Sequence, residues 1–182
     1  MPDIKIEVRL APECAYQELR WAWLAVHDGA AIGALAVADT IEEVDDETGE
    51  QRWPHHATIG HMYSEVRRHG IARKLLSSAQ AHLANELGLR LYRSGLATEG
   101  GRFATTCAGL ELAISPKVVW LHERDKQMAI RRGKEVRELE PRLDERAAEE
   151  QGIRMLNAIA ALMNVPLLEG AFESRCHPRL DS

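Results

Sequence analysis

Two apolar segments that flank an Asp-Gly pair limit the possible folds of this chain more than any other feature. Residues 19–26 and residues 30–37 are apolar at nearly every position, and Asp28-Gly29 lies between them. Glycine supplies the positive φ that a tight hairpin turn requires, so the pattern predicts two antiparallel strands. Because neither segment alternates between apolar and polar residues, we expect both faces of these strands to be covered by other elements.

The composition agrees with a globular chain that buries such a sheet. Of its 182 residues, 45% are apolar and 28% are charged, which predicts one domain or one domain with an extension. The formal charge of -5 argues against a surface devoted as a whole to nucleic acid or to an anionic membrane. No uncharged apolar segment approaches the roughly 20 residues of a membrane helix, so we expect no membrane partner.

The cysteines and the first residues bear on the compartment. The cysteines are far apart and odd in number, and no C-x-x-C pair occurs, which argues against a disulfide framework and a cysteine zinc site. The first five residues lack the charged-then-apolar order of a signal peptide. We therefore expect a reduced, cytoplasmic protein. The cysteines are Cys14, Cys107 and Cys176.

The first two thirds of the chain predict strands and helices in mixed order. Residues 4–10 alternate between apolar and charged, which indicates a strand with one wet face, and residues 57–66 predict another strand. Apolar residues at three- and four-residue steps predict a helix over 72–87, which Gly88 ends. A strand over 89–94 and a helix over 99–108, capped by Thr98, follow. This order predicts a mixed sheet with helices packed on it.

The last third is predicted to be mainly helical. Residues 110–114 suit a last strand, and Ser115-Pro116 then has the form of a helix start. Residues 117–132 are compatible with a helix, although 117–121 also suit a strand. An apolar stripe predicts a helix over 144–163, which faces the core or a dimer partner. We therefore divide the chain into a core, 1–114, and a helical extension, 115–182, that packs on the core or on a partner subunit.

The loop between the strand over 57–66 and the following helix has the most chemical content. It reads Arg67-x-x-Gly70-x-Ala72, and a sharp turn here leaves backbone N–H groups converging at the positive end of the helix. Gly70 allows close approach of a ligand, and Arg67, Arg68, Arg73 and Lys74 add positive charge. These features predict an anion site suited to a diphosphate, although they match neither the GxGxxG fingerprint nor a P-loop.

Residues 59–76, with the hairpin through Asp28-Gly29 and the order of elements around them, resemble the GNAT superfamily of acyl-CoA-dependent N-acyltransferases. The resemblance covers about residues 4–114 and implies an α/β fold, with a mixed, mostly antiparallel sheet and helices on both faces. It also implies acetyl-CoA, or another short acyl-CoA, as co-substrate and an amine as acceptor. An unrelated α/β turn is the alternative. The implied coenzyme A contacts are Met62, Ser64, Val66, Arg67, Arg68, His69, Gly70, Ile71, Ala72 and Arg73.

In that family the strand before the loop splays from the next strand, and the thioester lies in the opening near a backbone N–H, here around residues 62–64. A general base is expected beside the opening. Alternation places His61, Tyr63 and Glu65 on one strand face, with Met62 and Ser64 on the other, and Ser94 lies across the splay. We favour the set with Glu65, so the candidate catalytic residues are Glu65, Tyr63 and Ser94.

This sequence departs from the family at two places. The tyrosine acid that many members carry four residues before a glycine is Thr105 here, counted back from Gly109. Only residues 11–18 separate the first two strands, where the family has two helices that line the acceptor site. We therefore expect an acceptor side that is open, or built by the C-terminal helices or another subunit, and that suits a bulky amine such as one on a protein.

The sequence also contains an acidic cluster, three neighbouring histidines and a basic segment. Residues 39–50 carry seven acids and no Lys or Arg, which predicts a solvated hairpin tip or, alternatively, a wall that attracts a cationic acceptor. His55, His56 and His61 lack zinc-site spacing, so we expect no metal. Two other functions remain open: a catalytically inactive GNAT-like binding module, and a factor that contacts nucleic acid through the basic residues of 124–137. The seven acids are Asp39, Glu42, Glu43, Asp45, Asp46, Glu47 and Glu50.

Overall fold

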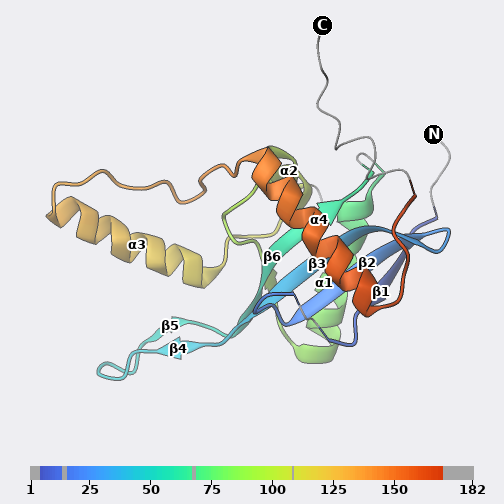
Figure 1. Ribbon diagram of the computed structural model, residues 1–182. Helices are drawn as coiled ribbons and strands as arrows, with labels where there is room; N and C mark the ends of the chain where they lie inside the picture. Colours follow the sequence, from blue (N-terminus) through green and yellow to red (C-terminus); the bar gives the residue numbers. More distant parts are fainter. Residues whose placement is uncertain (1–4, 14–15, 67–68, 108, 170–182) are drawn as a thin grey trace, which may run out of the picture.

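A curled five-stranded sheet forms the centre of the chain (Figure 1). The computed structural model describes residues 5–13, 16–66, 69–107 and 109–169. The strand order is β1-β2-β3-β6-β7, and every neighbouring pair is antiparallel except the parallel pair β6–β7. The predicted α/β class with a mixed, mostly antiparallel sheet is confirmed. The strands are β1 Glu7–Leu10, β2 Trp21–His27, β3 Ala30–Thr40, β6 His56–Ser64 and β7 Leu91–Tyr92.

The predicted hairpin joins β2 to β3. Asp28 and Gly29 both have positive φ, 47° and 79°, as a two-residue turn of primed type requires. The ladder runs from His27↔Ala30 to Trp21↔Val37. This prediction is confirmed, and the hairpin forms the middle of the sheet.

Two helices cover the two faces of the sheet, so the prediction that these strands are buried on both sides is also confirmed. Helix α1, Ile71–Leu87, packs with Trp23 and Leu35 on one face. Helix α4, Glu145–Leu162, packs with Leu24 and Ala36 on the other. The apolar stripe of α4 is therefore buried within its own chain; its fully buried residues include Met155, Leu156, Ile159 and Ala160.

The helix ends follow the capping residues that the sequence indicates. Gly88 ends α1 with φ 64°, and its N–H donates to the carbonyl of Ala84. The hydroxyl of Thr98 accepts from the N–H of Gly101 at the start of α2, Glu99–Thr106. Asp144, predicted as the first residue of its helix, instead caps α4 in the same way through the N–H of Ala147. Helix α2 ends before the predicted residue 108, because Cys107 is already extended.

Three sequence expectations over residues 89–132 need correction. Residues 110–114 form no strand, since Leu110 lies in a turn and Ile114 makes a single bridge to Arg93. Of the predicted strand over 89–94, only Leu91–Tyr92 form β7, and Arg93 continues as a single bridge whose N–H and carbonyl pair with Ala113 and Ser115. The ambiguous residues 117–132 lie in helix α3, Pro116–Arg131, so the strand alternative is wrong.

An arm, residues 41–53 and 116–138, projects from the body formed by the sheet, α1, α2 and α4 (Figure 1). It contains α3 and the hairpin of β4, Glu43–Val44, and β5, Gln51–Trp53. Six of the seven acids of 39–50 occupy this hairpin, as the hairpin-tip interpretation predicts, while Asp39 lies in β3. Among the described residues, no helix is long and apolar enough to cross a membrane.

Candidate functional site

A cleft opens between β6 and the residues that follow β7. The two strands pair only at Ala57↔Leu91 and Thr58↔Tyr92, because the chain after β7 then bonds to residues 113–115 on its other side. The cavity that results has a volume of about 100 Å³. Its walls are residues 59–62 of β6, residues 93–98, Gly101 and Thr105 of α2, Leu143, and Ala148, Gln151 and Gly152 of α4.

A β-bulge shapes the β6 wall of this cleft. On β3, Ala36 and Val37 are consecutive, but their partners His61 and Ile59 are two residues apart, so Gly60 is the extra residue. A bulge leaves one residue outside the regular ladder and is common beside functional sites. A Cβ on Gly60 would lie 2.5 Å from a methyl group of Leu19, so a larger residue here would require the Leu19 side chain to shift. The strand therefore presents irregular backbone to the cavity.

His61 follows the bulge and lines the cleft. Its Nε2–H donates to Oε1 of Gln17 at 3.2 Å, while Nε2 of Gln17 donates to the hydroxyl of Tyr16 at 3.4 Å. Because an amide oxygen only accepts, this arrangement leaves the lone pair of His61 on Nδ1. Burial lowers the pKa of His61 from its usual 6.5. The imidazole is therefore neutral at pH 7 and able to accept a proton.

The three candidate catalytic residues occupy different places. Ser94 lines the cleft, and its hydroxyl donates to the carbonyl of Leu96 at 3.2 Å. Tyr63 and Glu65 form a hydrogen-bonded pair of 2.7 Å, with the phenol as donor, and neither is part of the cavity wall. Tyr63 lies under α4, where a Cβ on Gly152 would come within 2.5 Å of its ring.

Thr105, the residue that the sequence resemblance places where many GNAT members carry a tyrosine acid, lines the cleft. Its side chain is buried, and its hydroxyl lies 3.1 Å from the carbonyls of both Gly101 and Arg102 within α2. The proton of Thr105 is thus directed to its own helix. A hydroxyl in this state is a poor proton donor for a leaving group in the cavity.

The start of α1 follows the carboxyl end of β6, the strand that forms one wall of the cleft. Gly70 has φ 71°, and no atom of the described residues beyond its chain neighbours lies within 4 Å of the place where a Cβ would stand. No side chain caps α1, and no acid lies in its first turn. The helix begins close to the end of β6: a Cβ on Gly33 would lie 2.8 Å from Ile71 and 3.0 Å from the carbonyl of Tyr63. Helix starts of this kind favour anions.

The other predicted coenzyme A contacts are distributed around this helix start. Met62 lines the cleft, whereas Ser64 pairs with Gly33 at the end of β6. Val66 packs against the core on the α1 side, and the side chain of Ile71 is buried there. A Cβ on Gly109 would lie 3.2 Å from Nη2 of Arg73, so this guanidinium reaches the residues after α2. His69 and Ala72 are half-buried, and Arg67 and Arg68 lie outside the described residues.

The histidines named in the sequence have separate hydrogen-bond partners. His55 lies 2.6 Å from Asp39, and the buried His56 bonds to the carbonyl of Pro54 and the hydroxyl of Ser115, both at 2.7 Å. Within the described part of the chain, no three His, Cys, Asp or Glu side chains gather as a metal site would require.

Comparisons with family models, with curated proteins and with solved structures found no match for this sequence. The assignment of this site therefore depends on the geometry of its own residues. Sequence reasoning missed Gln17 and Gln151, which the fold brings to His61 and the cleft from distant segments. It also missed the bulge, for which the only sequence signal is a glycine inside a strand pattern, at Gly60.

Proposed function

We propose that this protein transfers an acetyl or other short acyl group from an acyl-CoA to an amine, as the GNAT-like sequence features suggest. One observation carries the proposal: β6, which forms one wall of the cleft between the parallel strands, leads from its carboxyl end through Gly70 into α1. Ligands of α/β proteins commonly bind at the carboxyl ends of parallel strands. A carrier with a diphosphate at one end and a thioester at the other matches an anion site next to a small cavity.

The roles of the residues follow from their positions. Backbone N–H groups of residues 70–73 would hold the diphosphate, with Arg73 adding positive charge. The thioester would enter between β6 and residues 93–98, beside the bulge at Gly60. A cavity of about 100 Å³ suits a short acyl group, since ~10–15 Å³ on the same measure already holds one water molecule.

His61 is the base that this geometry favours. The neutral amine attacks the carbonyl carbon, a C–N bond forms, and the C–S bond breaks to release a thiolate. Nδ1 of His61 accepts the proton that the amine loses, and the resulting imidazolium returns a proton to the thiolate. Gln17 keeps the required tautomer by accepting from Nε2. Glu65, the base that the sequence favours, is engaged with Tyr63 and acts through an intervening water if it acts at all.

A binding module is the second candidate, and Thr105 favours it. The hydroxyl that replaces the family's tyrosine is committed to carbonyls of α2, so no dedicated acid lies at that position. Such a protein would bind coenzyme A without turnover. Thiol release from acetyl-CoA, measured with a panel of small and peptide amines, separates the two candidates.

Paired variants test the base. We expect His61→Gln to lower kcat about 100-fold or more, because a general base contributes about 10²–10⁴-fold. Glu65→Gln serves as the matched control and should retain most of the activity. For the wild type, kcat/KM should fall as pH decreases through a pKa below 6.5, because only neutral His61 accepts a proton.

The acidic limb of this pH profile should disappear in His61→Gln. Loss of activity in Glu65→Gln, with His61→Gln active and its pH profile unchanged, would assign the base to Glu65. Coenzyme A binding without thiol release in any amine would support the binding module.

A further inference from the structure

Helix α3 has 16 residues, none of which is buried in the chain. Most of the stability of a protein helix comes from packing an apolar face, and isolated helices of about this length are marginal in water. Nevertheless α3 exposes Met128 and Ile130 by 41% and 56%, and the facing hairpin exposes Ile41 and Val44 by 61% and 45%. These apolar side chains on both parts of the arm indicate a surface that another molecule covers.

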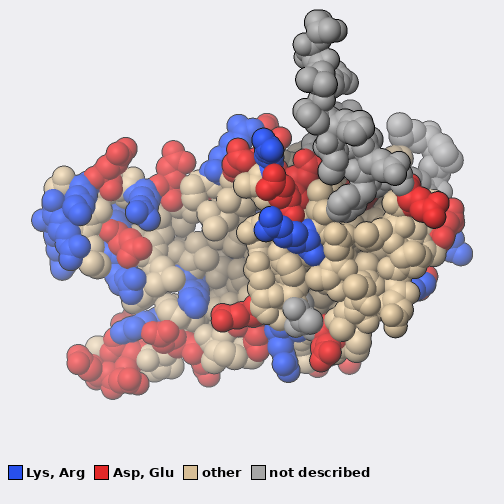
Figure 2. Space-filling model, viewed as in Figure 1, with Lys and Arg blue, Asp and Glu red and all other residues tan. Residues whose placement is uncertain are grey.

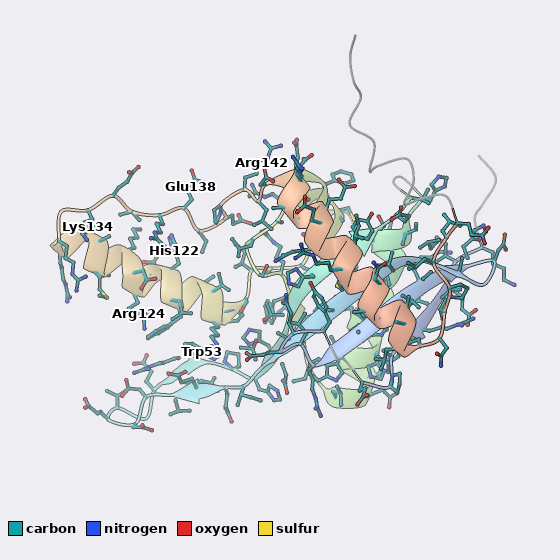
Figure 3. All side chains as sticks on the ribbon, viewed as in Figure 1. Trp53, His122, Arg124, Lys134, Glu138 and Arg142 are labelled. Atoms are coloured by element: carbon teal, nitrogen blue, oxygen red, sulfur yellow. The ribbon has the colours of Figure 1, made fainter. Side chains whose placement is uncertain are left out.

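The two ends of the arm carry opposite charges. Figure 2 shows blue side chains at the far end of α3 and red ones at the tip of the hairpin, and Figure 3 places Lys134 at that end of α3. The basic end of α3 consists of Arg131, Arg132 and Lys134, and none of these side chains forms an ion pair with another described residue. The acidic tip of the hairpin consists of Asp46, Glu47 and Glu50, which likewise form no ion pair with a described residue. All six side chains are exposed.

Other charges of the hairpin are already neutralised locally. Arg52 donates to Glu43 at 2.8 Å and to Asp45 at 2.7 Å. Together with the N–H groups of Thr48 and Glu47, Arg52 holds the pKa of Asp45 well below its usual range. The tip is therefore an ordered structure that presents its remaining acids outward.

The two ends do not neutralise each other within one chain, because the arm is fixed at its root. There, the rings of Trp53 and Trp120 meet edge to face with centroids 5.5 Å apart, and the guanidinium of Arg52 lies 5.0 Å from the Trp120 ring. Beyond the root, no ion pair joins the described residues of α3 to those of the hairpin. The basic end and the acidic tip appear as separate masses in Figure 2.

We propose that the arm is the interface of a homodimer, in which the basic end of α3 of each chain meets the acidic hairpin tip of the other. A two-fold axis repeats any contact between two different patches, so one interface contains this charge pairing twice. The three cations of the basic end equal in number the three acids of the hairpin tip. Met128 and Ile130 would then be covered by the apolar side chains of the partner's arm.

Charge reversal on one side tests this pairing. We expect the full-length wild type to be a dimer by sedimentation equilibrium, with a dissociation constant that rises with salt because exposed charges are screened. Arg131→Glu with Arg132→Glu should weaken the dimer by at least about tenfold, and so should Asp46→Lys with Glu47→Lys. A matched control is Glu149→Lys with Glu150→Lys, which alters two acids of α4 outside the arm and should leave the dimer intact.

Mixing the two reversed variants is the decisive experiment. In each homodimer of a variant, both charge contacts are repulsive, but in the mixed dimer both contacts again join opposite charges. Two monomeric variants should therefore form a heterodimer when combined. Circular dichroism spectra equal to that of the wild type would show that each variant is folded.

Three results would overturn the proposal. The first is a wild type that stays monomeric up to high concentration in low salt, and the second is a dimer that neither reversal weakens. The third is salt-sensitive binding of a short DNA or RNA duplex by a wild type that stays monomeric, lost in Arg131→Glu with Arg132→Glu and kept in Asp46→Lys with Glu47→Lys. That result would make the basic end a nucleic-acid contact instead.

Discussion

The body and the arm of this protein are held together by different interactions. In the body, α1 and α4 bury continuous apolar faces on opposite sides of one sheet, and Leu75 and Met155 are completely buried. In the arm, α3 buries no residue, and it meets the hairpin through two tryptophan rings and nearby cations.

This difference indicates that the body and the arm have different roles. Burial of apolar area is the main stabilising term in folding, so the body fixes the positions of the cleft and of the start of α1. Edge-to-face rings and cation–π contacts are each worth only about 1 kcal/mol, so they orient the arm without adding much to the stability of the body. We expect the proposed chemistry to depend on the body and the proposed association to depend on the arm.

A Met→Ala substitution made once in the body and once in the arm compares how much each region contributes to the free energy of unfolding. Met155→Ala in α4 removes a side chain with 0% exposure and should lower the free energy of unfolding by about 2–5 kcal/mol. Met128→Ala in α3, where the side chain is 41% exposed, should change it by less than about 0.5 kcal/mol. Urea denaturation of dilute protein in high salt measures both values. Equal losses at the two sites would show that α3 packs as tightly as α4.

A smaller effect is expected at the root of the arm. Trp120→Ala removes the ring that contacts Trp53 and Arg52, which should cost about 1 kcal/mol locally. Hydrogen exchange of α3 amides should then accelerate about fivefold, while exchange in α1 and in the sheet remains unchanged. Val119→Ala, a change at the neighbouring exposed position, is the control. Equal acceleration in α1 would contradict an arm that is independent of the body.

The body was largely predictable from the sequence because its signals are local. The Asp28-Gly29 turn, the glycine that ends α1 and the cap Thr98 act through their own backbone neighbours, and the structure confirms each of them. The apolar strands also predicted cover on both faces, since that pattern is unfavourable on a wet sheet.

The cleft and the arm were less predictable because they depend on distant contacts. The predicted strand over 110–114 fails because Glu111 adopts φ 44° in the turn after α2, although its apolar neighbours suit a sheet. Helix α3 has no buried face, so the spacing of its apolar residues did not distinguish a helix from a strand. The bulge at Gly60 depends on Leu19 and on the register with β3, and neither is visible in the local pattern.

Calorimetric titration of coenzyme A into Gly70→Glu tests the proposed anion site at the start of α1. The new side chain brings bulk and negative charge to an open position, and like charges in contact cost several kcal/mol, so affinity should fall by at least about 100-fold. Gly88→Glu is the matched control. Gly88 has a similar φ of 64° and equally open surroundings, but it lies at the opposite end of α1. The account predicts wild-type binding in Gly88→Glu and none in a folded Gly70→Glu; unchanged binding in Gly70→Glu would contradict it.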